Sequence, residues 1–187
     1  MKTVQQLFNL PETTFSFEFF PPKNQETYPA FIQTIQELKK FNPLFISVTY
    51  GAMGKTQEKT LEVVSDIKNN YNVETMVHFT CIGARHEEID HFLEELKQIG
   101  INDILALRGD IPDKVCKDKI LHEFKYAKDL VKYIKSKNLG FTICVAGYPE
   151  GHPETPDLDL SLKHLKQKVD AGADFIGADA LIAKVQG

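Results

Sequence analysis

Acidic and basic side chains follow several of the apolar runs in this sequence. Glu18 lies in FSFEFFPPK among four phenylalanines, and Asp110 follows Arg108 and Gly109 in ILALRGDIP. A carboxyl group that aromatic neighbours shield from water has a raised pKa, so it can act as a proton donor at neutral pH. An arginine with a flexible glycine beside it suits the binding of an anionic ligand. These residues predict acid catalysis on a charged ligand.

Each of these residues also has a purely structural interpretation. Glu18 is equally suited to an ion pair with a lysine or arginine across the fold, and Asp110 to capping its own loop. His78 lies inside an apolar run, where a single histidine is more often a hydrogen-bonded core residue than a ligand. His152, in YPEGHPE, is expected to be more exposed and to contact a ligand. The residues alone leave these alternatives open.

Other catalytic chemistries find little support. His86 and His91 are five residues apart, about 140° around a helix, so they cannot bind one metal ion from a single face. The sequence has no G-x-S-x-G elbow and no G-x-G-x-x-G motif, and GAMGKT lacks the spacing of a phosphate-binding loop. No metal site is therefore predicted.

Net charge, apolar runs and cysteine content indicate which partners and which cellular compartment to expect. The 187 residues carry a net charge of -4, which gives no basic surface for nucleic acid. No apolar run is long enough to span a membrane. Cys81, Cys116 and Cys144 form no C-x-x-C pair and are odd in number, which argues against a disulfide framework. We expect a cytoplasmic protein that binds neither nucleic acid nor membranes.

Strand-like and helix-like segments alternate with a period of about thirty residues. Between the strand-like runs lie amphipathic segments, for example Phe31, Ile35 and Leu38 at helical spacing. Alternation of this kind predicts a parallel sheet, either open and doubly wound or closed as a (β/α)₈ barrel. The missing dinucleotide motif favours the barrel. The strand-like runs begin near Phe15, Leu44, Glu74, Asn102, Gly140 and Ala173.

A complete barrel has eight units and typically about 250 residues, whereas this sequence has five units and a sixth strand. The predicted fold class is therefore an α/β, TIM-type (β/α)₈ barrel that is incomplete. In such barrels the carboxyl ends of the strands converge on one mouth, which carries the site. Because side chains alternate along a strand, Phe15, Phe17 and Phe19 are expected to pack under helices, while Glu18 points into the barrel.

Seven stretches together resemble the methylenetetrahydrofolate reductase family, over the chain up to about Ile176. They are FSFEFFPPK, ISVTYGAMG, HFTCIGA, ILALRGDIP, YAKDLV, YPEGHPE and LKQKVDAGAD. The resemblance implies a barrel that binds FAD, is reduced by NADH or NADPH, and converts 5,10-methylenetetrahydrofolate to 5-methyltetrahydrofolate. It implies that Glu18 supplies the proton for opening the folate ring, and that Asp110 favours the cationic folate intermediate.

The resemblance also implies a set of flavin contacts. Arg108 and Lys168 are expected to bind the diphosphate, because both are cations. The complete implied set is Thr49, Tyr50, Ala52, His78, Arg108, Gly109, Asp110, Tyr126, Ala146, His152 and Lys168.

The end of the chain departs from the family pattern. After DAGADFI the sequence reads GADALIAKVQG, without the family's next strand end or its later units. We therefore predict a partial barrel over residues 1–176, a divergent tail over 177–187, and impaired activity. Unpaired strand edges invite association, so a homo-oligomer is expected. The alternative function is a non-catalytic barrel fragment that binds flavin or associates with itself.

Overall fold

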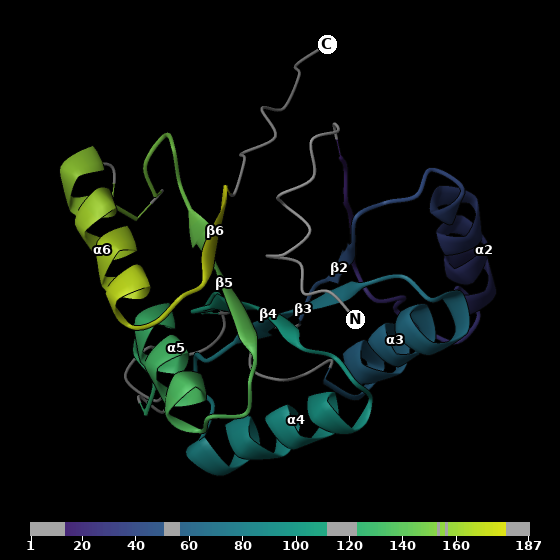
Figure 1. The fold of residues 1–187 in the computed structure, drawn as a ribbon, viewed down its shortest axis with the longest axis horizontal. Coiled ribbons are helices and arrows are strands. Elements are labelled where there is room, and N and C mark those ends of the chain that lie inside the picture. Colours follow the sequence, from purple (N-terminus) through teal and green to yellow (C-terminus); the bar gives the residue numbers. More distant parts are fainter. Residues whose placement is uncertain (1–13, 51–56, 112–122, 153, 156, 179–187) are drawn as a thin grey trace.

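The structure is a computed structural model that describes residues 14–50, 57–111, 123–152, 154–155 and 157–178 (Figure 1). Strands and helices alternate along these residues. The strands are β1 (Phe17–Phe19), β2 (Ile46–Val48), β3 (Thr75–Thr80), β4 (Asp103–Leu107), β5 (Thr142–Gly147) and β6 (Phe175–Ala178). The helices are α2 (Tyr28–Lys39), α3 (Gln57–Tyr71), α4 (His86–Gln98), α5 (Ala127–Ser136) and α6 (Leu158–Asp170).

The strands form one parallel sheet in the order β1-β2-β3-β4-β5-β6. Figure 1 shows the sheet curled, with the helices along its outer side. The described residues thus supply six of the eight strands of a closed barrel. The predicted incomplete (β/α)₈ fold is confirmed.

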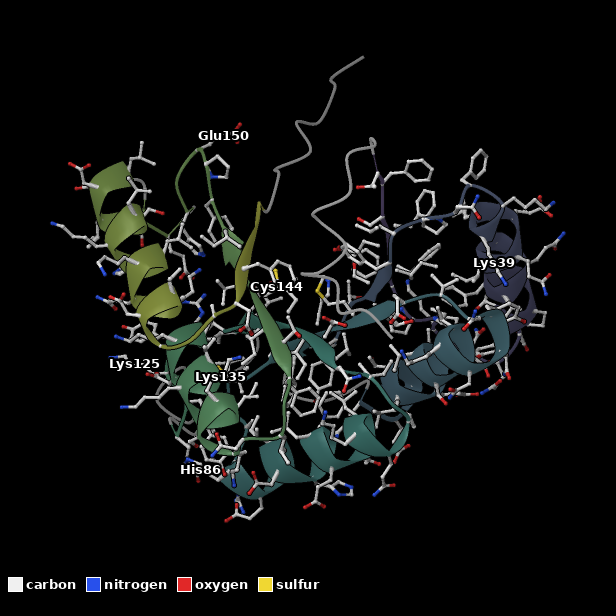
Figure 2. The ribbon with its side chains drawn as sticks, in the orientation of Figure 1. Lys39, His86, Lys125, Lys135, Cys144 and Glu150 are labelled. Atoms are coloured by element: carbon white, nitrogen blue, oxygen red, sulfur yellow. The ribbon has the colours of Figure 1, made fainter. Side chains whose placement is uncertain are left out.

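Side-chain alternation divides the sheet into two faces. The outer face and the helices enclose the main core, in which Phe79 of β3 packs on Phe92 of α4 with ring centroids 4.4 Å apart. Phe17 and Phe19 pack against this core as predicted, whereas Phe15 is 46% exposed. Cys144 lies on the opposite, concave face (Figure 2). Polar residues can therefore collect inside the curl without disturbing the core.

Local sequence signals set the helix boundaries. The Glu88 carboxylate accepts the backbone N–H of Arg85 at 2.8 Å and so caps the start of α4. The Asp157 side chain accepts the N–H of Leu160 at 3.0 Å at the start of α6. Gly100 follows the last turn of α4 with φ of 79°, and Asn138 follows that of α5 with φ of 52°, so both helices end in a left-handed residue.

An apolar surface is exposed along α6 and β6. Leu158, Leu162 and Val169 lie within about 40° of one another around the helix axis. They are 48%, 52% and 43% exposed, and Ile176 of β6 is 47% exposed. We call these four residues the α6–β6 apolar surface. None of the described helices is both long and apolar enough to cross a membrane.

The Phe79–Phe92 contact predicts a large stability difference between two phenylalanine substitutions. Phe92→Ala should lower the free energy of unfolding by about 3–5 kcal/mol, because it leaves a cavity in a fully buried site. Phe41→Ala, at a site 61% exposed, should change it far less. Urea unfolding monitored by circular dichroism measures both, and equal losses would contradict this assignment of the core.

Candidate active site at the carboxyl ends of the strands

Glu18 lies on β1 and faces the adjoining strands from the inner side of the sheet. Ser47 of β2 donates its hydroxyl to Glu18 Oε2 at 3.5 Å. His78 Nε2, from β3, lies 3.2 Å from the same oxygen. The sequence left open an ion pair with lysine or arginine, but the neighbour is a histidine. The inward direction predicted for Glu18 agrees with these contacts.

The expectation of a raised pKa at Glu18 is wrong for this structure. The nearby His78 imidazole is the largest influence and lowers the pKa of the carboxyl group, against a smaller opposing effect of burial. The Glu18 side chain is 54% exposed, so water also stabilises the charge. The phenylalanines on either side point to the other face of the strand and do not enclose it. Glu18 is therefore an ionised carboxylate at neutral pH in this state.

Two buried polar atoms on β3 have no hydrogen-bond partner among the described residues. They are His78 Nε2 and Thr80 Oγ1, and each residue is only 7% exposed. The His78 nitrogen lies within reach of Glu18, but the geometry does not form a well-directed hydrogen bond. Buried polar groups are rarely left unsatisfied in native proteins. Thr80 Oγ1 is therefore available to bond a ligand on the inner face, whereas His78 Nε2 faces Glu18 Oε2.

Gly109 brings the backbone close to Thr80. Its φ is 86°, and a Cβ atom placed there would lie 2.8 Å from Thr80 Cβ and 3.0 Å from Ile82 Cγ2. No other residue type fits without displacing β3 or its loop. The packing of Gly109 against Thr80 and Ile82 thus explains why a glycine stands here.

Arg108 forms a two-pronged ion pair with Glu154, a residue that the sequence analysis did not single out. Nη1 donates to Oε2 at 2.6 Å and Nη2 to Oε1 at 3.0 Å. The remaining guanidinium donor, Nε, bonds the carbonyl of Gly109 at 3.2 Å. The Glu154 carboxylate raises the pKa of Arg108. The predicted anion clamp therefore already holds an anion, supplied by the loop after β5.

The same loop connects the other residues predicted from β5 and α6. His152 Nδ1 accepts the backbone N–H of Glu154 at 3.1 Å, and the His152 ring packs edge-on against Tyr148 at 4.6 Å. Lys168 Nζ lies 5.7 Å from the centre of the Tyr148 ring and donates to the carbonyl of Ala146 at 2.5 Å. Tyr148, the first residue of the YPEGHPE stretch, links these groups.

The remaining predicted contacts lie apart from these groups or outside the described residues. The Tyr50 ring packs on Phe79 and Phe92 in the helix layer, with centroids at 5.5 and 5.1 Å. Tyr126 precedes α5, where its backbone N–H donates to the Asp129 carboxylate at 2.9 Å, and the residue is 46% exposed.

Asp110 is exposed beside Arg108, where its charge contributes to raising the arginine pKa. The Thr49 carbonyl accepts the hydroxyl of Thr60 at 3.3 Å. Ala52 and most of the predicted tail, residues 179–187, lie outside the described residues. Within the described ranges, β6 continues to Ala178, past the boundary expected at residue 176.

Metal and thiol chemistry find no support in the described residues. No three histidine, cysteine or acidic side chains converge within the described ranges. His86 Nδ1 lies 2.5 Å from Glu123 Oε2, while His91 Nε2 lies 3.6 Å from Glu95 Oε2, so the two histidines have separate partners. Burial raises the pKa of the Cys144 thiol to about 12, which disfavours a thiolate nucleophile.

These features define a parallel β/α half-barrel whose mouth combines an inner carboxylate, unsatisfied polar atoms and two cations. The sequence model of the methylenetetrahydrofolate reductase family matches residues 3–182. The chain belongs to the methylenetetrahydrofolate reductase family, which confirms the resemblance found in the sequence. The match runs beyond residue 176, and the domain boundary there stays a prediction.

Two curated relatives illustrate the similarity of this chain to the family. It is 42% identical to "Methylenetetrahydrofolate reductase (NADH) 1" of Arabidopsis thaliana over 94% of this chain and 32% of the relative. It is 43% identical to "5,10-methylenetetrahydrofolate reductase" of Buchnera aphidicola subsp. Baizongia pistaciae, over 90% of this chain and 56% of the relative. The chain thus spans between a third and little more than half of these relatives.

The crystal structure of 2,3-dimethylmalate lyase superposes with a TM-score of 0.56 over 96% of this chain and 62% of the lyase chain. Their 11% identity supports the shared fold alone.

The contact of Gly109 with Thr80 predicts a selective sensitivity to alanine. Gly109→Ala should destabilise the protein by at least about 1 kcal/mol more than Gly140→Ala, since it adds a steric clash to the left-handed strain. Gly140 is the matched control, because it has similar φ and nothing within 4 Å of an added Cβ. Thermal unfolding of both variants tests this, and equal destabilisation would show that the loop absorbs the methyl group.

The Glu18–His78 contact predicts a pH effect with a definite sign. A carboxyl pKa lowered by folding stabilises the protein above the unfolded-state pKa, and that stability is lost as pH falls through the folded-state pKa. In wild type the Glu18 pKa should lie below the ordinary glutamate value of about 4.3, and His78→Asn should raise it. Carbon-13 NMR titration of glutamate carboxyls measures both. An unshifted wild-type value would refute the coupling.

Proposed function

We propose that this chain carries the active site of a methylenetetrahydrofolate reductase, which uses FAD and NADH or NADPH to make 5-methyltetrahydrofolate. The observation that supports this proposal most directly is the contact of Glu18 on β1 with His78 on β3, in a chain of this family whose Arg108 directly follows β4 of the same parallel sheet. The named relatives support the substrate, but they are longer, so the activity is proposed here for the chain's own site. A cytoplasmic location accompanies this proposal.

The described residues fit a flavin dinucleotide. Thr80 Oγ1 is a buried atom with unused bonding capacity, suited to the polar edge of a ring or to ribityl hydroxyls. Arg108 and Lys168 would hold the diphosphate, because both are cations. The flavin, when bound, supplies the hydride chemistry.

Glu18 would move the proton that opens the folate ring. In the present state the carboxylate is ionised and half exposed. Covering it with substrate would remove water from the charge, and desolvation raises a carboxyl pKa. Oε2 would then take up a proton and give it to the departing ring nitrogen. Asp110, exposed near Arg108, would favour positive charge on the folate.

Glu18→Gln should separate proton transfer from cofactor binding. The amide cannot donate a carboxyl proton, so the rate of folate reduction should fall by about 10²–10⁴-fold. FAD affinity and the oxidation of NADH with an artificial acceptor should change little. Single-turnover kinetics of each half-reaction measure the split. Retention of most folate reduction would remove Glu18 from the role of acid.

A second candidate function is a self-associating fragment, favoured by the α6–β6 apolar surface. Exposed apolar side chains that gather on one side of a helix are typical of an interface, and the proposed occupant is a second copy. Leu162→Asp with Val169→Asp should convert an oligomer to monomer in sedimentation velocity runs. Lys163→Asp, on another side of α6, is the control. A wild-type monomer at micromolar concentration would remove this candidate.

A further inference from the structure

The ion pair between Arg108 and Glu154 joins two loops at the mouth of the half-barrel. Arg108 follows β4, and Glu154 lies in the loop between β5 and α6. Both guanidinium Nη atoms bond the carboxylate, at 2.6 and 3.0 Å, and Nε bonds the Gly109 carbonyl. All three nitrogens of the fork are thus engaged by the protein itself.

The pair has the geometry with which arginine binds a phosphate group. Carboxylate and phosphate both offer two oxygens to the parallel N–H groups of a guanidinium. The Arg108 side chain is 27% exposed and the Glu154 side chain 60% exposed, so water and solutes reach the pair. A ligand phosphate can therefore exchange with the carboxylate without opening the core.

The position of Glu154 is set by neighbours that also belong to the mouth. Its backbone N–H bonds His152 Nδ1 at 3.1 Å, and the His152 ring rests on Tyr148. The Tyr148 ring in turn lies below Lys168 Nζ. The loop thus holds a carboxylate against one cation while it packs against the second. Displacement of the carboxylate would open both Nη groups of Arg108 to a phosphate, while Lys168 stays beside the Tyr148 ring of the same loop.

We propose that Glu154 is a built-in counterion of Arg108 that a diphosphate-bearing ligand displaces, so that Glu154 sets the affinity of the mouth for such ligands. The inference rests on the proposed function, because it takes the ligand to be a dinucleotide such as FAD. Glu154 costs affinity by competing for Arg108, and it keeps the arginine oriented while the site is empty. Asp110 also acts on Arg108, but only through its charge.

Binding of inorganic pyrophosphate and of FAD to the full 187-residue chain tests the proposal. Isothermal titration calorimetry is suited to pyrophosphate, and flavin fluorescence to FAD. Glu154→Gln should tighten pyrophosphate binding by about three- to tenfold, because an exposed ion pair of this kind contributes modestly and its loss also removes a repelling charge. The affinity of the Glu154→Gln variant for FAD should also increase.

Two matched variants isolate the effect. Glu150→Gln removes the same charge from the tip of the same loop (Figure 2), and it should leave both affinities unchanged. In an Arg108→Gln background, Glu154→Gln should give no gain, because the competition no longer exists. Circular dichroism melts of all variants establish that they are folded.

The outcomes separate this inference from the proposed function. Three results would overturn the counterion role. They are unchanged or weaker pyrophosphate binding in Glu154→Gln, no pyrophosphate binding to any form, and an equal gain from Glu154→Gln when Arg108 is already replaced. If FAD binds wild type and Glu154→Gln alike, the inference alone fails. If pyrophosphate responds as expected but no form binds FAD, the inference stands for diphosphates and the flavin function fails.

Discussion

The alternation of side chains along short parallel strands is the constraint on which the site depends. In β3, Val77 and Phe79 enter the core beneath the helices, and His78 and Thr80 consequently face the inside of the curl. The apolar packing of one face therefore fixes the direction of the polar groups on the other. A register shift of one residue would exchange the two sets and remove the site. The functional groups are held by the same contacts that stabilise the fold.

The mouth differs from the inner face in how its charges are held. Glu18 contacts strand residues whose positions the sheet determines. Arg108 and Glu154 lie on loops, and their side chains are 27% and 60% exposed. Loops can rearrange at lower cost than strands. This contrast suits a site in which the acid must stay in place while the anion-binding groups exchange partners with a ligand.

Much of this arrangement could be predicted from the sequence. The repeated units gave the parallel order of the strands, and the family motifs pointed to Glu18, His78 and Arg108. The pKa of Glu18 was predicted in the wrong direction, because adjacent phenylalanines in sequence lie on the opposite face, and because His78 is distant in sequence. Glu154 was missed for a similar reason, since its partner is 46 residues away. The contact of Tyr50 with the flavin stays a prediction, and its ring packs with Phe79 and Phe92 of the core. Pairwise contacts between loops leave no periodic signal in a sequence, whereas strands and helices do.

NMR mapping of FAD binding on the nitrogen-15-labelled chain tests the central claim most directly. The account predicts saturable shifts of the amide signals at the carboxyl ends of the strands, around Glu18, His78, Gly109 and His152, with little change along the outer helices. Shifts centred on the α6–β6 apolar surface, or no saturable shifts at millimolar FAD, would contradict the claim that the inner mouth of the half-barrel is the ligand site.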